Sequence, residues 1–298
     1  MNAFKRAVFV SFLLFQCACY YDDVENNTLE PGEINYAQIK SEARGTVRLQ
    51  VYLPPTWNKD TLEAYPLIIY LHGQFGDEHS FFFNVNYRDL NRWVNTGEVP
   101  PFVLVSADCQ SIYRDDRQWS SNPNETFLTS DEDNELRAFC LKNFNAGGRP
   151  EIVSIHGQST GARGAVHYGL KFPDRFASAV SNAFVSDYAI EEEQLNAFEN
   201  RDQIISSGIR LRLVIGSLDQ YYLTMGRKAT YLMHDYLESL GIQHEFEILS
   251  GATHFLYSIW NCKNGTGMKN GLYELKLHAS AWNLSESGGT YAHSEQAL

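Results

Sequence analysis

The strongest constraint on this chain lies in residues 151–165, where an apolar segment runs into a serine between two glycines. Residues 151–156 predict a strand, and the residues after Gly161 predict a helix. Ser159 lies between them, two residues after Gly157 and two before Gly161. A strand that turns this tightly into a helix leaves no room for side chains at the two glycines and points the serine hydroxyl outward. The pattern predicts a nucleophilic serine, provided that the rest of the chain supplies its partners.

Composition favours one folded domain with a sizeable core. The chain has 298 residues, of which 44% are hydrophobic and 13% aromatic, and these values argue against disorder. The formal net charge of −12 disfavours nucleic acids and anionic membrane surfaces as partners. The sequence has no apolar run of the roughly 18 residues that a membrane-spanning helix needs.

Residues 1–19 have the pattern of an export signal. Lys5 and Arg6 precede a short apolar run over residues 7–15, and Cys19 follows a small residue. One interpretation is a bacterial lipoprotein signal, in which Cys19 is acylated and attaches the chain to a membrane. The other is ordinary cleavage nearby, which would release a secreted protein. Both place the mature chain in the cell envelope or outside the cell, and residues 20–43 are expected to form a polar arm.

Three cysteines remain if the export segment is removed: Cys109, Cys140 and Cys262. Their number allows at most one disulfide bond among them, and the sequence favours no pairing. Because none has the spacing of a metal ligand, we expect no metal and no cofactor.

Strands and helices alternate through residues 44–262, which predicts an α/β sandwich with a mostly parallel sheet and helices on both faces. We assign residues 263–298 to a C-terminal extension of unknown role. Residues 108–131 are expected to form a long polar loop, and the acidic residues 187–206 a helical insertion over the site. The expected strands are residues 46–53, 65–71, 102–107, 151–158, 176–181, 211–215 and 243–249, and the other expected helices are residues 90–96, 132–144, 161–171 and 226–240.

Two further polar residues follow predicted strands in the order that a serine nucleophile requires. Asp219 follows residues 211–215, and His254 follows residues 243–249. In α/β-hydrolases the chain order is serine, acid, histidine, and the carboxyl ends of parallel strands meet at one edge of the sheet. A single aspartate here is often a helix cap, and a single histidine is often a bystander. Three matching roles in order predict a triad of Ser159, Asp219 and His254.

The loop after residues 65–71 is expected to complete an oxyanion hole. Its backbone donor would be the N–H of Gln74, paired with the N–H of Thr160 directly after the nucleophile. Gly73 allows the backbone to approach the substrate. His72 precedes the acid in the chain, so we interpret it as a residue of the turn and not as the base. His156, inside the strand, is expected to be packed.

Residues 48–260 resemble the esterase D-like family, which includes feruloyl and acetylxylan esterases, S-formylglutathione hydrolases, enterochelin esterases and mycolyltransferases. The resemblance lies in the residues around the predicted strand ends: Val51-Tyr52-Leu53-Pro54-Pro55, Leu71-His72-Gly73, Gly157-Gln158-Ser159-Thr160-Gly161, Phe172-Pro173-Asp174-Arg175-Phe176-Ala177, Gly216-Ser217-Leu218-Asp219, Leu240-Gly241-Ile242, Gly251-Ala252-Thr253-His254 and Trp260. It implies an α/β-hydrolase fold with the same three triad roles. The chain departs from the family in having Thr160 where methionine is usual and Ala162 where the second of two glycines is usual, and Arg163 directly after them is also unusual.

The resemblance and the export signal together imply a serine esterase that acts on carbohydrate-linked esters, such as feruloyl or acetyl groups on a polysaccharide. We expect Phe75, Trp119, Arg163 and Trp260 to contact substrate. For Trp119 packing of the loop is an equal alternative, and for Arg163 the alternative is an ion pair with the acidic segment 187–193. Two other functions stay open: acyl transfer to a sugar acceptor on the same triad, and non-catalytic binding on a hydrolase scaffold.

Overall fold

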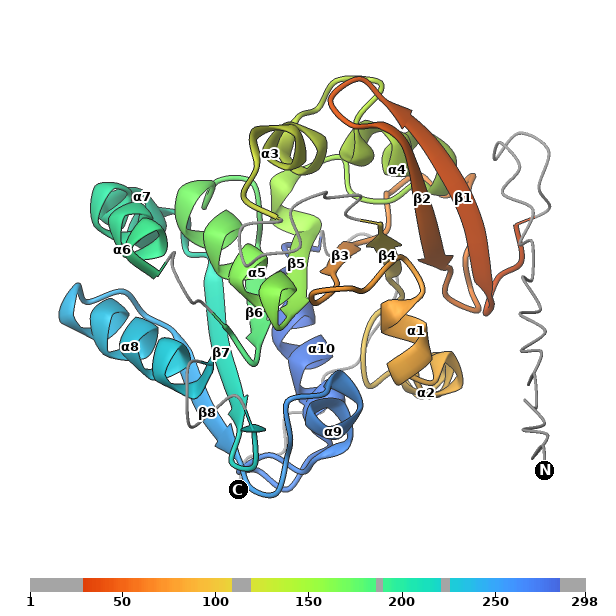
Figure 1. Ribbon diagram of the computed structural model, residues 1–298. Helices are drawn as coiled ribbons and strands as arrows, with labels where there is room; N and C mark the ends of the chain where they lie inside the picture. Colours follow the sequence, from red (N-terminus) through yellow and green to blue (C-terminus); the bar gives the residue numbers. More distant parts are fainter. Residues whose placement is uncertain (1–28, 109–118, 186–189, 221–225, 285–298) are drawn as a thin grey trace, which may run out of the picture.

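The computed structural model describes residues 29–108, 119–185, 190–220 and 226–284. An eight-stranded sheet forms its centre, in the order β1-β2-β4-β3-β5-β6-β7-β8 (Figure 1). The strands from β4 to β8 run parallel, and β1 and β2 add an antiparallel edge. The predicted α/β sandwich is therefore confirmed. The strands are β1 Ile34–Ser41, β2 Gly45–Tyr52, β3 Leu67–Leu71, β4 Val103–Ala107, β5 Val153–Gln158, β6 Ser178–Asn182, β7 Arg210–Gly216 and β8 Glu245–Leu249.

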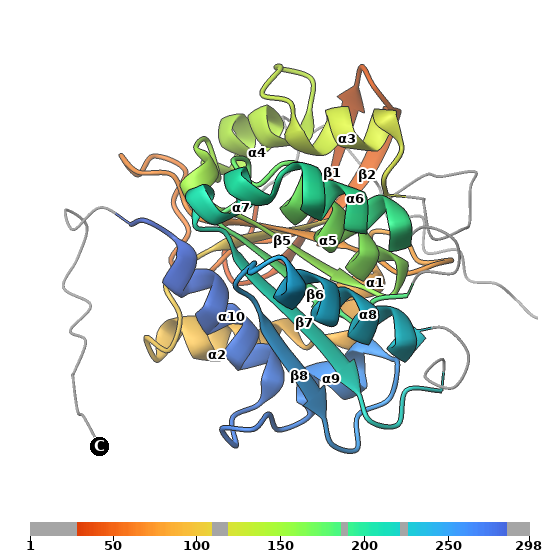
Figure 2. The ribbon, with the colours of Figure 1, turned by 90° about the vertical axis from the view of Figure 1, so that its left-hand side faces the viewer.

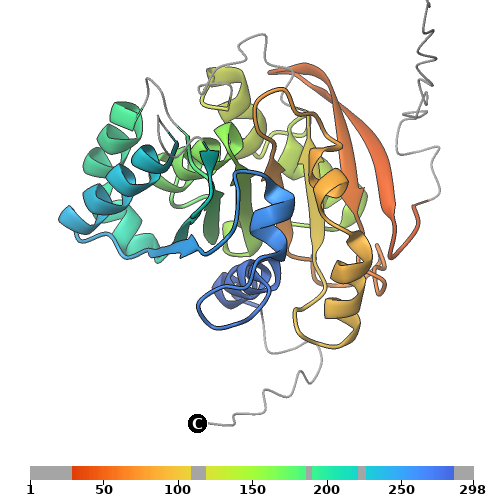
Figure 3. The ribbon, with the colours of Figure 1, turned by 60° about the horizontal axis from the view of Figure 1, so that its bottom comes forward.

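Helices cover both faces of the sheet, because each central strand is apolar on both sides. Leu67, Ile69 and Leu71 of β3 join the core under α3 to α8, whereas Ile68 and Tyr70 join the core under α1, α2, α9 and α10. Figures 2 and 3 show these two layers on opposite sides of the sheet. The helices are α1 Ser80–Asn84, α2 Tyr87–Asn95, α3 Asn122–Thr129, α4 Leu136–Phe144, α5 Thr160–Lys171, α6 Ile190–Glu199, α7 Arg201–Ser207, α8 Gly226–Ser239, α9 Leu256–Asn261 and α10 Asn270–Ala281, with a short 3-10 turn at Pro150–Ile152.

Two segments expected to be irregular contain a strand or a helix in the part that the structure describes. The arm expected at residues 20–43 contains β1, which pairs along its whole length with β2. Ala37 and Ile39 are the only buried apolar residues of β1, so the strand has a weak apolar pattern in the sequence. The loop expected at residues 108–131 contains α3, whose first turn carries Pro123. A proline in the first turn is a signal in the sequence that a helix begins there.

The expected insertion at residues 187–206 is two helices, α6 and α7, which form part of the crossover from β6 to β7. Helix α6 packs against α5 and α8 on the face of the sheet, and α7 also contacts α5. The segment therefore belongs to the layered fold. Asp187 and the rest of residues 186–189 lie outside the described residues.

The largest correction concerns the C-terminal boundary at residue 262. Helix α10 packs on the sheet, burying Leu272, Leu275 and Leu277, and Trp282 just after it is also buried. Gly271 lies so close to the ring of Trp260 that a Cβ there would be 2.2 Å from ring carbon Cε2. The domain therefore extends through α10 to residue 284, and the buried side chains of this segment are part of its core.

Buried polar groups also attach α10 to the sheet. His278 bonds His156 of β5 at 3.2 Å and Ser178 of β6 at 2.7 Å, and Asn182 donates to Glu274 at 3.1 Å. Burial lowers the pKa of His156 to about 3 and raises the pKa of Glu274 to about 7. His156 is therefore neutral and packed, as expected, and these groups depend on α10 for their hydrogen bonds.

Among the described residues, Cys140 and Cys262 carry free thiols, while Cys109 and Cys19 lie outside them. Burial raises the pKa of the Cys140 thiol, which makes it unreactive. Within the same residues, no helix is both long and apolar enough to cross a bilayer.

We predict that a chain ending at residue 262 does not fold, whereas a chain ending at residue 284 unfolds as cooperatively as the full-length protein. Each buried leucine of α10 contributes about 2 kcal/mol, and the sum approaches the total stability of a domain, roughly 5–15 kcal/mol. Urea unfolding followed by circular dichroism provides the measurement. A cooperative transition of the shorter chain with the parent m-value would contradict the prediction.

Candidate active site

The turn around Ser159 is as crowded as the sequence predicted. A Cβ at Gly157 would lie 1.9 Å from the carbonyl oxygen of Gly161, and a Cβ at Gly161 would lie 2.0 Å from the carbonyl oxygen of Leu71. Neither position accepts any side chain. Ser159 itself has φ 59° and ψ −118°, a conformation that costs a non-glycine residue about 1–3 kcal/mol. The turn is held by the packing of α5 against the end of β3.

The structure brings Ser159, His254 and Asp219 together from the ends of three strands. Ser159 Oγ lies 2.9 Å from His254 Nε2, and His254 Nδ1 lies 2.8 Å from Asp219 Oδ2. Ser159 follows β5, Asp219 follows β7 and His254 follows β8. A Cβ at Gly216 would lie 2.3 Å from the carbonyl oxygen of Ala252, so the loops after β7 and β8 are in close contact. Gln158 Nε2 also donates to the His254 carbonyl at 2.9 Å.

This geometry sets the proton positions. Asp219 and His254 are both buried, so their hydrogen bond is shielded from water. When Nδ1–H donates to the carboxylate, Nε2 is left as an acceptor for the serine hydroxyl. The three groups can therefore move a proton away from Ser159 Oγ.

The loop after β3 lies against the nucleophile, where the sequence placed the oxyanion hole. A Cβ at Gly73 would be 3.1 Å from Ser159 Cβ and 2.6 Å from Gln158 Oε1. Gln74 follows in this loop, and Thr160 is the first residue of α5. The helix dipole adds positive potential at the same point. These features fit backbone donation to a developing oxyanion.

His72 supports this loop and is not the base. Its ring meets Trp119 edge-on with 5.1 Å between ring centroids, and its carbonyl accepts the indole N–H of Trp119 at 2.9 Å. Burial lowers the pKa of His72 and keeps its imidazole neutral. This placement agrees with the turn role expected from the sequence.

Three of the four expected substrate contacts are wrong for this structure. Trp119, Arg163 and Trp260 are all buried inside the domain. Trp119 contacts His72 and Gly164 of α5. Trp260 packs against Gly271 in the core under α1, α2, α9 and α10. The fourth, Phe75, is exposed in the loop that lies against Ser159.

Arg163 instead belongs to a buried ionic cluster that the sequence did not reveal as a whole. Its guanidinium contacts Glu193 at 2.8 Å and Glu192 at 2.6 Å, which confirms the alternative of an ion pair with the acidic segment. His167, one turn later on α5, contacts Glu193 at 3.1 Å through Nδ1 and Glu125 at 2.8 Å through Nε2. The i, i+4 spacing of Arg163 and His167 was the available signal, since both project from one face of a helix.

The charges of this cluster control the protonation of His167. Burial by itself lowers the pKa of His167. The negative charge of Glu193 and the hydrogen bonds that the imidazole donates to Glu125 and Glu193 outweigh burial and raise the pKa to about 9. The imidazole is therefore a cation at neutral pH. Together with Arg163 it fastens α6 to α5, the helix that begins at the nucleophile.

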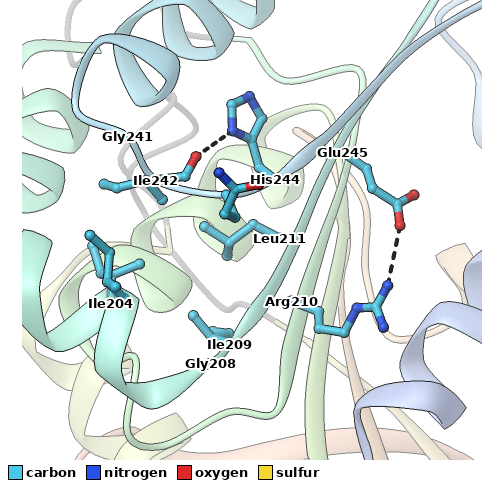
Figure 4. Close-up of a pocket in the computed structure, with 11 residues that line it drawn as sticks. Ile204, Gly208, Ile209, Arg210, Leu211, Gly241, Ile242, His244 and Glu245 are labelled. Atoms are coloured by element: carbon cyan, nitrogen blue, oxygen red, sulfur yellow. Dashed lines mark hydrogen bonds and ion pairs between the residues drawn. The ribbon is translucent and has the colours of Figure 1, made fainter.

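A cavity of about 480 Å³ is lined by residues of α7, of β7 and of the segment that leads into β8 (Figure 4). Arg210 and Glu245 line it, and they are the first residues of β7 and β8, whereas the triad follows the last residues of these strands. Ile204, Ile209 and Ile242 supply much of its apolar surface. This cavity is therefore not the substrate site of the triad.

Asp77, Glu78 and His79 form the one cluster in the described residues with metal-ligand spacing, with one ligand atom each within 4.8 Å of the others. The buried carboxylate of Glu78 is paired with Arg48 at 3.3 Å. The guanidinium of Arg48 therefore compensates the negative charge of Glu78.

Comparison with known proteins agrees with the fold. Residues 41–228 match the family described as "Putative esterase". The match covers more than half of the chain and includes Ser159 and Asp219. The chain belongs to this esterase family. It is therefore a carboxylic ester hydrolase, and His254 lies beyond the matched residues.

Solved structures of esterases share the fold at low sequence identity. A ferulic acid esterase aligns with a TM-score of 0.66 and 17% identity, over 84% of this chain and 98% of its own. A ferulic acid esterase from Anaeromyces mucronatus, in complex with ferulic acid, aligns at 0.64 and 14%, over 86% and 93%. An S-formylglutathione hydrolase from Agrobacterium tumefaciens aligns at 0.60 and 19%, over 86% and 97%. No curated protein sequence matches the chain.

We predict that the protein loses stability between pH 6.5 and pH 9.5 and that His167→Gln loses much less. The folded-state pKa of His167 is raised from 6.5 to about 9. Its stabilisation is therefore complete below pH 6.5 and disappears as the pH rises through 9, by up to about 3 kcal/mol. Urea unfolding at four pH values measures the slope, with the surface variant His79→Gln as the control. Parallel slopes for His167→Gln and the parent would contradict the prediction.

Proposed function

We propose that this esterase acts in the cell envelope or outside the cell, on carbohydrate-linked esters such as feruloyl or acetyl groups. The observation that carries the catalytic part is the continuous chain of contacts from Ser159 Oγ through His254 to Asp219. The export pattern in residues 1–19 supports the location. The structural likeness to proteins described as ferulic acid esterases supports the substrate class.

The first half of the reaction forms an acyl-enzyme. Ser159 Oγ attacks the ester carbonyl carbon while its proton passes to His254 Nε2, and Asp219 stabilises the resulting imidazolium without taking its proton. The carbonyl oxygen becomes an oxyanion, which accepts hydrogen bonds from the backbone N–H groups of Gln74 and Thr160. The intermediate collapses when the bond to the alcohol oxygen breaks. His254 Nε2–H then protonates that oxygen, and the alcohol leaves.

The second half releases the acid. Water gives a proton to His254 Nε2 as its oxygen attacks the acyl carbon, and a second oxyanion forms in the same place. The bond from this carbon to Ser159 Oγ then breaks, and Oγ recovers the proton from His254. The enzyme returns to its starting state, so one water is consumed for each ester.

We predict that Ser159→Ala lowers the hydrolysis of p-nitrophenyl acetate at least 1000-fold, because the nucleophile is lost. Asp219→Asn should lower kcat by a similar order, since it favours the wrong tautomer of His254. Ser239→Ala, at the far end of α8, is the matched control and should change the rate less than twofold. Equal rates for the parent and Ser159→Ala would contradict the catalytic assignment.

The same assay with methyl ferulate and acetylated xylan tests the substrate class. We expect a higher kcat/KM for at least one of these two substrates than for p-nitrophenyl acetate. If the protein hydrolyses neither of them, the proposed substrate class is contradicted.

Membrane fractionation of cells producing the parent and Cys19→Ser tests the location. Release of the variant alone would indicate a lipid anchor, equal release of both would indicate secretion, and retention of both in the cytoplasm would contradict export.

A further inference from the structure

Next in the chain to Gln74, Asp219 and His254 are three exposed apolar residues. Phe75 follows Gln74 and is 72% exposed, Leu218 precedes Asp219 and is 63% exposed, and Phe255 follows His254 and is 62% exposed. Exposed large apolar side chains are ordinary when scattered, but a group of them around one site marks a binding surface. Each of the three loops that carry Gln74, Asp219 and His254 thus presents an exposed apolar side chain.

Phe75 also has an unfavourable backbone conformation. The N–H of Gly76 donates to the carbonyl of Gly73 at 3.1 Å, which closes a four-residue turn with Phe75 in its third position at φ 63°. That position favours glycine or asparagine, and a bulky residue is an outlier there. With most of its surface exposed, Phe75 contributes little burial to offset this strain. Strain of this kind concentrates at functional sites.

The chemistry of the triad limits what the ring can contact. The carbonyl oxygen of a bound ester lies at the N–H of Gln74, and the leaving alcohol lies near His254, which must protonate it. The ring centroid of Phe255 is 6.5 Å from that of the His254 imidazole, so Phe255 lies near the group that protonates the alcohol. Phe75 is the residue next to the oxyanion donor, with its Cα about 3.8 Å from that of Gln74.

We propose that Phe75 is a specificity-determining residue whose ring contacts an apolar acyl group of the ester. This inference rests on the proposed esterase function and adds the acyl preference of the same site. An apolar acyl chain or aryl ring removes the exposed face of Phe75 from water, whereas an acetyl group is too short to do so. The enzyme therefore prefers longer or aromatic acyl groups to acetyl groups.

The test compares p-nitrophenyl acetate with p-nitrophenyl octanoate, which share one leaving group. We expect Phe75→Gly to lower kcat/KM for the octanoate about tenfold, as loss of an apolar contact does, and for the acetate less than twofold. Phe75→Leu should recover most of the octanoate rate. The melting temperature of Phe75→Gly should be equal to or above that of the parent, because glycine accepts φ 63° without strain. Phe198→Ala, a 63% exposed phenylalanine on α6, is the matched control.

Each outcome separates this inference from the proposed function. If the parent hydrolyses both esters and Phe75→Gly lowers both rates equally, or neither, the acyl contact is overturned and the esterase assignment stands. If the same selective loss occurs in Phe198→Ala, a general effect of surface apolarity replaces the contact. If the parent hydrolyses neither ester and Ser159→Ala is indistinguishable from it, the proposed function and this inference fall together.

Discussion

The active site depends on one close contact between two backbones, that of Gly161 with the carbonyl of Leu71. It joins the start of α5 to the end of β3, which are about ninety residues apart in the chain. Because the contact leaves no space for a Cβ, Ser159 is held in its strained conformation beside the oxyanion loop. Ser159 and the loop that we propose stabilises the oxyanion are thereby fixed relative to each other before any substrate binds.

The sequence predicted this part because its signals are local. The glycines around Ser159, and a polar residue after each apolar strand, identify the edge at which the strands end. Strand pairing then brings Asp219 and His254 to the serine without further information. The sequence did not predict two elements that depend on contacts with other parts of the chain. Strand β1 pairs with β2, and helix α10 is buried against the sheet. Neither has a strong periodic signal of its own.

The errors in the expected substrate contacts have the same origin. Residue type indicated that Trp119 and Arg163 were chemically able to bind a ligand, but it did not indicate their partners. Trp119 is used to support the carbonyl of His72, and Arg163 to neutralise Glu193. An aromatic or charged residue near a catalytic motif is therefore weak evidence for substrate binding until its burial is known.

Helix α5 is held at several points along its length, and this explains why a site with a strained serine can be stable. Gly161 meets β3, Arg163 pairs with α6, and the hydroxyl of Tyr168 donates to the carbonyl of Trp119 at 2.7 Å. These contacts are made by groups buried inside the domain. Rigidity is therefore supplied by buried groups behind the serine, and exposed residues such as Phe75 are left to adjust the site to its acyl group. In this fold the catalytic geometry and the substrate preference can change independently, because different residues determine them.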